Sequence, residues 1–186
     1  MSTLPTLAPL PLVVDLDGTL IYDDLLWLSI EVLARSKPWR ILQLPLWLFR
    51  SKTGFKHVLG EAAGWPIDVA KLRYRPALVA WLREERARGR TLVLATASPQ
   101  IYAERVGAHI GLFDACLGSR IDLNLGGVNK ARVLLARFGA GKFVYAGDSA
   151  KDIPVWNCAA AAVPVGVARR LSVYIERNFT IERSFD

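Results

Sequence analysis

The sequence predicts an α/β fold with an open, doubly wound parallel sheet of five strands. Five short apolar segments bounded by turn residues have the pattern of strands that are buried on both faces, as the strands of a parallel sheet are. Segments with helical spacing of apolar residues separate most of them, and this alternation is typical of an open α/β sheet. The candidate strands are residues 12–16, 91–96, 115–118, 142–147 and 161–165.

The candidate helices carry start and stop signals. The segment 76–89 begins with Pro and ends with Gly, an asymmetry that helices prefer. Ser98 and Pro99 look like the N-cap and the first residue of a second helix, which Gly111 ends. A third helix ends at Gly139 and has an apolar stripe formed by Ala131, Leu134, Leu135 and Phe138.

One stretch breaks the alternation of strands and helices. Residues 24–75 separate the first two strands, look helical throughout and are too long for a simple crossover. We expect an inserted helical cap of three helices, broken near residues 37–38 and 52–54. Asp23 or Asp24 is expected to be the N-cap of its first helix.

Composition excludes several classes of protein. With 52% hydrophobic and 22% charged residues, the chain is not intrinsically disordered. No apolar run approaches the roughly 20 residues that a membrane-spanning helix needs. Cys116 and Cys158 make no disulfide framework. The first basic residue is Arg35, so we expect no N-terminal targeting signal and a cytoplasmic protein.

The inserted segment concentrates the charge of the chain, whose formal net charge is +7. It holds nine Lys and Arg residues against four acidic ones, and four of the six tryptophans. Three interpretations stay open: a cap core with a solvated basic face, an element that rests on anionic lipid, and an electrostatic funnel for a polyanionic substrate. Because no nucleic-acid-binding motif accompanies the charge, nucleic acid is the least favoured partner.

Polar residues stand where three of the candidate strands end and where the third helix begins. In open α/β sheets, ligands bind at the carboxyl ends of the strands, near the point where the strand order reverses. We therefore expect these residues to meet at one edge of the sheet. They are Asp15, Asp17, Thr96, Lys130, Asp148 and Asp152.

The carboxylates of this set indicate a metal site. Asp15 and Asp17 would share one face of a regular strand and repel each other, and Asp148 would add to the repulsion. A hard divalent cation such as Mg²⁺ relieves this repulsion. Its charge also keeps a carboxylate ionised, so that Asp15 could act as a nucleophile.

Other residues at this edge indicate a phosphate site. Lys130 at a helix N-terminus faces the positive end of the helix dipole, an arrangement that makes sense if both point at a shared anion. Thr96 offers a hydroxyl donor at the adjacent strand end, and Gly18 lets backbone amides approach the anion.

Several of these residues also have a purely structural alternative. Asp17 could be a turn residue before Gly18, and Lys130 could be a solvated surface lysine. Asp152 could form a capping box with Ser149. Their joint appearance at strand ends favours a functional site over coincidence.

Four motifs resemble those of the haloacid dehalogenase (HAD) superfamily. Residues 14–20, Val-Asp-Leu-Asp-Gly-Thr-Leu, are similar to its first motif. Thr96 is similar to the second motif, Lys130 to the third and residues 147–152 to the fourth. The resemblance runs from about residue 12 to residue 170.

The resemblance implies a domain layout. It implies a Rossmann-like parallel sheet with strand order 5-4-1-2-3 and an inserted helical cap of the C1 type. The catalytic core would consist of residues 1–23 and 76–186, and the cap of residues 24–75.

The resemblance also implies a phosphatase mechanism. Asp15 would attack the phosphorus and form an aspartyl-phosphate. Asp17 would protonate the leaving oxygen and then activate the water that hydrolyses the intermediate. Thr96 and Lys130 would hold the phosphoryl oxygens, with Gly18 beside them.

A metal site and its support follow from the same resemblance. Mg²⁺ would be bound by the carboxylates of Asp15 and Asp148 and by the backbone carbonyl of Asp17. Asp152 would orient Lys130 or a metal-bound water.

A narrower resemblance points to a membrane partner. Five segments are similar to the HAD domains that precede UbiA-like membrane prenyltransferases: residues 11–20, 24–27, 44–48, 92–98 and 145–149. It implies a phosphatase for a small phosphometabolite or a lipid-linked phosphate, in peripheral contact with an anionic membrane or a membrane prenyltransferase at the inner face of the membrane. Two alternatives stay open: a phosphomutase, and a non-catalytic module that binds phosphate and metal and regulates a membrane prenyltransferase.

Overall fold

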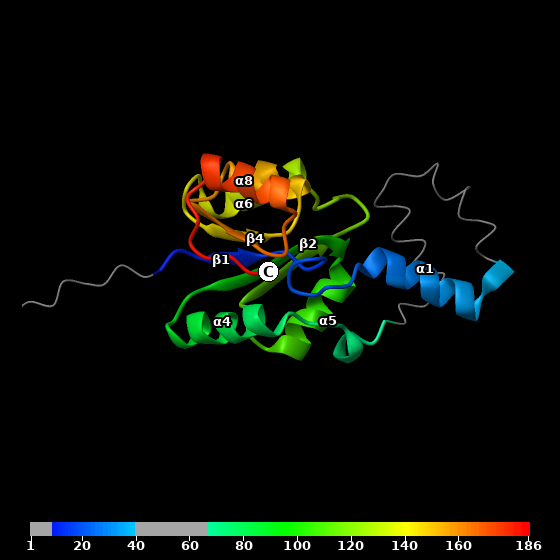
Figure 1. Ribbon diagram of the computed structural model, residues 1–186. Coiled ribbons are helices and arrows are strands. Elements are labelled where there is room, and N and C mark those ends of the chain that lie inside the picture. The colour runs from blue at the N-terminus through cyan, green and yellow to red at the C-terminus, as the bar shows by residue number, and fades with distance from the viewer. Residues whose placement is uncertain (1–8, 40–66) are drawn as a thin grey trace, which may run out of the picture.

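Five parallel strands form the sheet on which the fold is built. The computed structural model describes residues 9–39 and 67–186. The strands are β1 (Leu12–Val14), β2 (Leu92–Pro99), β3 (Ala115–Ser119), β4 (Val144–Gly147) and β5 (Ala161–Pro164). They pair in the order β3-β2-β1-β4-β5, which confirms the predicted fold class and strand order (Figure 1).

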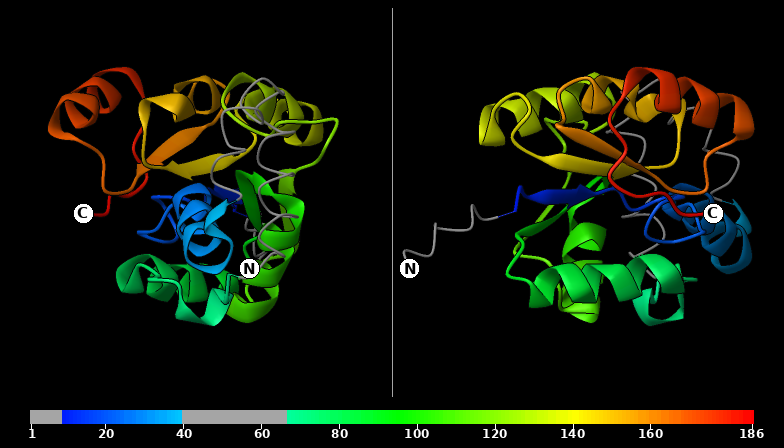
Figure 2. Two further views of the ribbon diagram at one scale, coloured as in Figure 1. Left: turned by 90° about the vertical axis from the view of Figure 1, so that its right-hand side faces the viewer. Right: turned by 60° about the vertical axis from the view of Figure 1, so that its left-hand side comes forward.

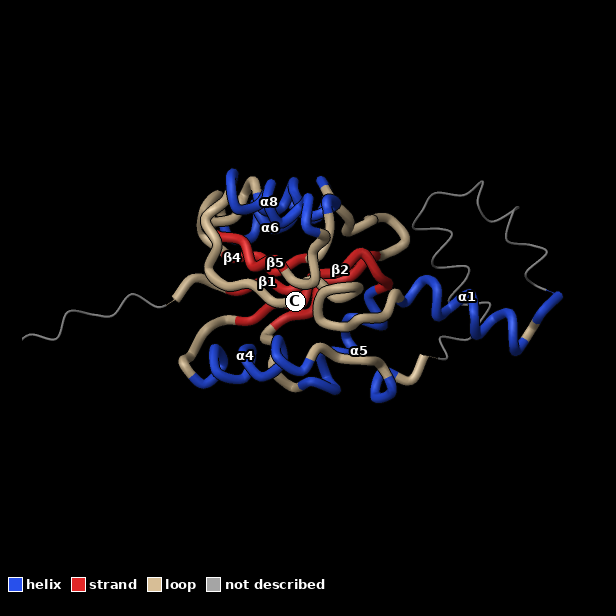
Figure 3. Tube along the Cα trace, in the orientation of Figure 1, coloured by secondary structure: helices blue, strands red, loops and turns tan. Residues whose placement is uncertain are grey.

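Helices cover both faces of this sheet. On one face lie α4 (Pro76–Ala87) and α5 (Gln100–Ile110), and on the other lie α6 (Val128–Phe138) and α8 (Arg169–Asn178), as Figures 2 and 3 show. The short helices η3 (Ala150–Asp152) and α7 (Ile153–Trp156) follow β4. Helices α4, α5 and α6 confirm the three helices that were expected between the strands, whereas α8 was not predicted. Among the residues that the structure describes, no helix is long and apolar enough to cross a membrane.

Alternation along β1 divides the core into two clusters. All three residues of β1 are fully buried. Leu12 and Val14 pack with side chains of α4 and α5, whereas Val13 packs with Leu134 of α6 and Ile175 of α8. Burial of each such side chain contributes about 2 kcal/mol, which is why a strand with two covered faces is a continuous apolar run.

The strand order determines where the site lies. β1 pairs with β2 on one side, where Leu12 is opposite Leu92, and with β4 on the other, where Val13 is opposite Tyr145. The order of the strands along the chain reverses between β1 and β4. Because the strands are parallel, the residues that follow β1 and β4 emerge at the same edge of the sheet, where ligands bind in this fold class.

The end of β2 differs from the expectation. The strand continues to Pro99, which pairs with Ser119 of β3, and α5 begins only at Gln100 without a side-chain cap. The prediction that Ser98 is an N-cap is therefore wrong. Its hydroxyl donates instead to the carboxylate of Asp17 over 2.6 Å, so a tertiary contact replaces the local one.

The inserted segment begins with α1 (Leu25–Ser36), which extends away from the sheet (Figure 1). The carboxylate of Asp24 accepts hydrogen bonds from two backbone N–H groups of its first turn, at 2.8 and 3.3 Å, which confirms Asp24 as the N-cap. The helix ends beside the expected break at residues 37–38. The expected break at residues 52–54 lies outside the described residues, and the division into core and cap stays a prediction.

The chain returns from this segment through η2 (Val69–Lys71) and is fastened to the core beside the loop after β1. Arg73 donates to the carboxylate of Asp23 through its backbone N and its Nε, each over 2.8 Å. The guanidinium of Arg75 donates to the backbone carbonyl of Gly18 through Nη2 at 3.1 Å and Nε at 3.3 Å. The outgoing and returning linkers therefore both contact the loop that carries the first motif.

A buried arginine joins three segments of the core. The side chain of Arg90 is 4% exposed, and its guanidinium pairs with Glu85 of α4 and with Glu182 after α8. Its Nε also donates to the carbonyl of Leu10, before β1, over 2.7 Å. These contacts hold both ends of the described chain against α4.

Arg90→Met should lower the free energy of unfolding by about 3 kcal/mol, because the buried carboxylate of Glu85 loses its buried partner. Unfolding in urea measures the change. Arg88→Met is the matched control, since Arg88 also pairs with Glu85 but its side chain is 66% exposed. We expect that control to lose less than about 1 kcal/mol. Equal losses in the two variants would contradict the stabilising role of the buried pair.

Candidate active site

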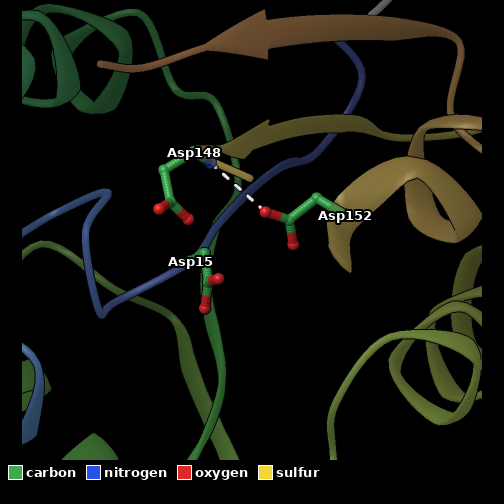
Figure 4. A group of neighbouring side chains, drawn as sticks. All are labelled: Asp15, Asp148 and Asp152. Atoms are coloured by element: carbon green, nitrogen blue, oxygen red, sulfur yellow. Dashed lines mark hydrogen bonds between the residues drawn. The ribbon is translucent and has the colours of Figure 1, made fainter. Parts of the chain in front are cut away.

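Three carboxylates meet at the carboxyl edge of β1 and β4. Asp15 follows β1, Asp148 follows β4, and Asp152 ends η3 (Figure 4). One carboxylate oxygen of each lies within 4.8 Å of the others. We call these three residues the carboxylate cluster.

Asp152 is fixed by the turn in which it lies. Its Oδ2 accepts a hydrogen bond from the backbone N of Asp148 over 3.2 Å (Figure 4). It also accepts from the backbone N of Ser149 over 3.2 Å. The reciprocal contacts between Ser149 and Asp152 form a capping box, which confirms that alternative. The capping box leaves the other oxygen, Oδ1, free of the turn, and this oxygen accepts from the hydroxyl of Tyr145 over 2.8 Å. The predicted functional role of Asp152 stays a prediction.

Lys130 reaches the carboxylate cluster from the first turn of α6. Its Nζ lies 2.9 Å from Asp15 Oδ1 and 3.8 Å from Asp152 Oδ1, and it donates to the hydroxyl of Tyr145 over 2.7 Å. The side chain is 3% exposed, so the alternative of a solvated surface lysine is wrong.

Asp17 lies beside the carboxylate cluster and turns its side chain toward β2. Its Oδ2 accepts from the hydroxyls of Ser98 at 2.6 Å and Thr96 at 3.1 Å. Its Oδ1 accepts from the backbone N of Leu25, the first residue of α1, over 2.8 Å. The predicted acid–base residue is thus attached both to β2 and to the first turn of the inserted segment.

Gly18 makes room for the carboxylate cluster. Its φ of +76° favours glycine, and a Cβ at this position would collide with the carboxylate of Asp148. Its N–H donates to the carbonyl of Asp23 over 3.3 Å. The glycine therefore allows the close approach of Asp148, and the expectation that it lets backbone amides approach an anion stays a prediction.

Burial and neighbouring charges oppose the ionisation of two members of the carboxylate cluster, Asp15 and Asp148. Burial raises the pKa of Asp15 to about 7; the charge of Lys130 opposes this increase, and the carboxylates of Asp152 and Asp17 add to it. Burial, followed by the charge of Asp152, raises the pKa of Asp148 to about 6. A positive charge at this place would favour the ionised forms.

The carboxylate cluster fits a hard divalent cation, because it offers only oxygen donors and because the raised pKa values of Asp15 and Asp148 oppose their ionisation without added positive charge. Asp15 and Asp148 belong to the predicted ligand set, and Asp152 is a third carboxylate beside them. The side chain of Asp17 contacts Thr96 and is not part of this cluster, and its backbone carbonyl as a ligand stays a prediction. Mg²⁺ as the cation stays a prediction.

The sequence from residue 12 to residue 156 matches the haloacid dehalogenase-like hydrolase family. The chain belongs to this family. The family-level prediction from the four motifs is therefore confirmed, and the site described above lies where these motifs meet.

One curated relative is the uncharacterized protein y4nM from Sinorhizobium fredii (strain NBRC 101917 / NGR234). It is 37% identical over 158 residues, which cover 84% of this chain. The match covers 30% of the relative, so this chain spans about a third of that protein's length.

Solved structures share the fold of this HAD chain. A Bordetella pertussis Tohama I protein of unknown function is 15% identical, with a TM-score of 0.73 and coverage of 95% of this chain and 97% of that one. A phosphoserine phosphatase in apo form is 14% identical, with a TM-score of 0.63 and coverage of 95% and 92%. A phospho-aspartyl intermediate analogue of phosphoserine phosphatase is 13% identical, with a TM-score of 0.58 and coverage of 96% and 93%.

Three site residues of this HAD chain were not predicted from the sequence. Tyr145 links Lys130 and Asp152, and Ser98 contacts Asp17. The fully buried Thr19 donates to Asp148 Oδ1 over 3.5 Å. For Tyr145 a signal existed, since a hydroxyl in an otherwise apolar strand needs a buried partner.

Gly18→Ala should weaken Mg²⁺ binding about 10- to 100-fold, because the added methyl group displaces Asp148. Titration calorimetry measures the affinity. Gly89→Ala is the matched control, since Gly89 has a φ of +79° and nothing within 4 Å of its added Cβ. It should lose about 1 kcal/mol of stability and keep the Mg²⁺ affinity. The same affinity in both variants would contradict this role of Gly18.

Asp15→Asn should stabilise the metal-free protein at pH 8 by at least about 1 kcal/mol. The carboxyl has a pKa near 7 when folded against an ordinary value of 3.8, so unfolding between these values releases a proton. Its contribution to stability is complete below about pH 4 and is lost as the pH rises through 7. Urea unfolding between pH 4 and 8 in a chelator measures this dependence.

The control for this prediction is Asp24→Asn, which changes a carboxylate to an amide at an exposed N-cap. It should change the free energy of unfolding by less than about 1 kcal/mol, because Asn is as good an N-cap as Asp. An Asp15→Asn curve that runs parallel to the wild-type curve between pH 4 and 8 would contradict the raised pKa of Asp15.

Proposed function

We propose that the chain is a phosphoric monoester hydrolase that requires Mg²⁺ and forms an aspartyl-phosphate on Asp15. The observation that carries this proposal is the 2.9 Å contact between Asp15 Oδ1 and Lys130 Nζ inside the carboxylate cluster. A nucleophilic carboxylate must approach an anionic phosphoryl group, and adjacent positive charge offsets their repulsion. The phosphatase structures that share the fold support the same reaction class.

In the first step, a carboxylate oxygen of Asp15 attacks the phosphorus, and the bond from phosphorus to the leaving oxygen breaks. Asp17 donates a proton to that oxygen. The hydroxyl of Ser98 and the N–H of Leu25 fix the side chain of Asp17 for this transfer.

In the second step, water attacks the phosphorus of the aspartyl-phosphate. Asp17 accepts the proton of the water, the bond from Asp15 to phosphorus breaks, and inorganic phosphate leaves. The same side chain thus acts first as acid and then as base, so the enzyme returns to its starting protonation state.

The remaining residues bind and orient. When substrate binds, the hydroxyl of Thr96 turns from Asp17 to a phosphoryl oxygen, which Lys130 also holds. Asp152 orients Lys130 through the hydroxyl of Tyr145. Asp15, Asp148 and the backbone carbonyl of Asp17 are the proposed ligands of Mg²⁺. When bound, the cation supplies positive charge that keeps Asp15 ionised and offsets the charge of the phosphoryl group.

The substrate that we propose is a small phosphometabolite or a lipid-linked phosphate. The proposed setting is the cytoplasm, in peripheral contact with an anionic membrane or a membrane prenyltransferase. Its support is the resemblance of the five segments named above. The longer relative from Sinorhizobium fredii is compatible with a partner domain or protein.

The wild type should hydrolyse p-nitrophenyl phosphate in Mg²⁺ and release inorganic phosphate, and chelation should abolish turnover. Asp15→Asn should lower kcat by at least about 1,000-fold, because the nucleophile is lost. Asp24→Asn, which keeps a good N-cap, should leave kcat within about twofold. Turnover that survives in Asp15→Asn would contradict the mechanism. A folded wild type that turns over no phosphoester would favour the non-catalytic alternative, and return of the phosphate to the substrate would favour a phosphomutase.

Asp17→Asn should accumulate the aspartyl-phosphate. An aryl phosphate has a good leaving group, so phosphorylation needs little help from an acid, whereas hydrolysis of the intermediate still needs the base. Acid quenching followed by mass spectrometry should detect one added phosphoryl group on Asp17→Asn and none on Asp15→Asn. Absence of the adduct from both variants would contradict the assignment of the base.

A further inference from the structure

A buried tyrosine is hydrogen-bonded both to the lysine of the site and to Asp152. The hydroxyl of Tyr145 accepts from Lys130 Nζ over 2.7 Å and donates to Asp152 Oδ1 over 2.8 Å. The direct distance from Lys130 Nζ to Asp152 Oδ1 is 3.8 Å, whereas Nζ lies 2.9 Å from Asp15 Oδ1.

These distances are unequal although both acids are candidates to pair with the same ammonium. An ammonium and a carboxylate in direct contact lie about 2.8 Å apart. Lys130 comes close to this distance with Asp15 but lies 3.8 Å from Asp152, and the phenol hydroxyl is hydrogen-bonded to both groups. The hydroxyl therefore satisfies Asp152 without bringing the lysine to it.

The second carboxylate oxygen of Asp152, Oδ2, supports the turn after β4. Oδ2 accepts from the backbone N of Asp148 and of Ser149, and so anchors the turn that presents Asp148 to the carboxylate cluster. A direct ion pair with Lys130 would compete for the orientation of this carboxylate. The tyrosine thus separates two tasks, the support of the turn by Asp152 and the contact of Lys130 with Asp15.

The core holds Tyr145 in a fixed position. Tyr145 is fully buried in β4, where it pairs with Val13 of β1. Trp156 donates from its indole Nε1 to the backbone carbonyl of Tyr145 over 3.1 Å, and the two rings pack edge to face. The position of the hydroxyl is therefore set by the sheet and the core, away from solvent.

We propose that Tyr145 is a positioning residue whose hydroxyl, hydrogen-bonded to both Lys130 and Asp152, keeps the ammonium of Lys130 on Asp15. This inference rests on the proposed function in that it takes Asp15 as the nucleophile. It assigns to Tyr145 a contribution to the phosphoryl-transfer step that acts through Lys130.

A crystal structure of Tyr145→Phe tests directly whether the hydroxyl of Tyr145 positions Lys130, and this test needs no activity. Phenylalanine keeps the ring and its packing and removes only the hydroxyl. We expect Lys130 Nζ to approach Asp152 to about 2.8 Å and to leave Asp15. Nζ that remains within 3 Å of Asp15 in the variant would overturn the proposal.

A double-mutant cycle tests the consequence for catalysis. Tyr145→Phe should lower kcat about 10-fold or more and change KM less than about threefold, because a displaced group slows the chemical step more than it weakens binding. In an Asp152→Asn background the attraction of Lys130 toward residue 152 is weaker. Tyr145→Phe should therefore lower kcat less than about threefold in that background. An equal loss of kcat in both backgrounds would overturn the proposal.

A destabilised variant is the matched control. Phe143→Leu removes packing from the same fully buried core cluster and leaves the hydroxyl of Tyr145 intact. It should lower Tm as much as Tyr145→Phe or more, with kcat within about twofold of the wild type. A wild type without phosphatase activity would refute only the proposed function. The crystal structure of Tyr145→Phe would still show whether the hydroxyl of Tyr145 positions Lys130.

Discussion

Repulsion among the buried carboxylates at one edge of the sheet is the constraint on which the site depends. The cluster exists because β1 and β4 are parallel neighbours, so that the residues after Val14 and Gly147 emerge together. Burial and mutual charge raise the pKa values of Asp15 and Asp148. Lys130, delivered by the first turn of α6, offsets part of this charge, and a divalent cation would offset the rest.

The loop after β1 connects this charged cluster to the inserted segment. Asp17 accepts a hydrogen bond from Leu25, the first residue of α1, and Gly18 accepts from Arg75 on the returning linker. The N-cap Asp24 is the neighbour of Leu25, so the start of α1 is fixed by two acids with different tasks. The proposed acid–base residue and the inserted segment are thus parts of one hydrogen-bonded unit.

Local sequence signals predicted the strands, the polar residues at their ends and the lysine at the start of α6. These features depend on burial on both faces of a strand and on helix starts, and both are encoded within a few residues. They failed at Ser98, where Ser-Pro looks like a helix start but the strand continues to pair with Ser119 of β3. At Asp152 they predicted the capping box, which is a local contact. They did not predict its contact with Tyr145, which depends on the tertiary fold, as does its distance to Lys130. Pairing of side chains across strands depends on register, which no single segment encodes.

Proton release on cation binding tests the central claim most directly. If the carboxylate cluster holds the metal, Mg²⁺ must displace the protons that raised pKa values retain on Asp15 and Asp148. Calorimetric titration of the wild type in buffers of different ionisation enthalpy should detect proton release near pH 6.5 that falls toward zero by about pH 8.5. Binding without proton release at any pH, or no binding at all, would contradict the account.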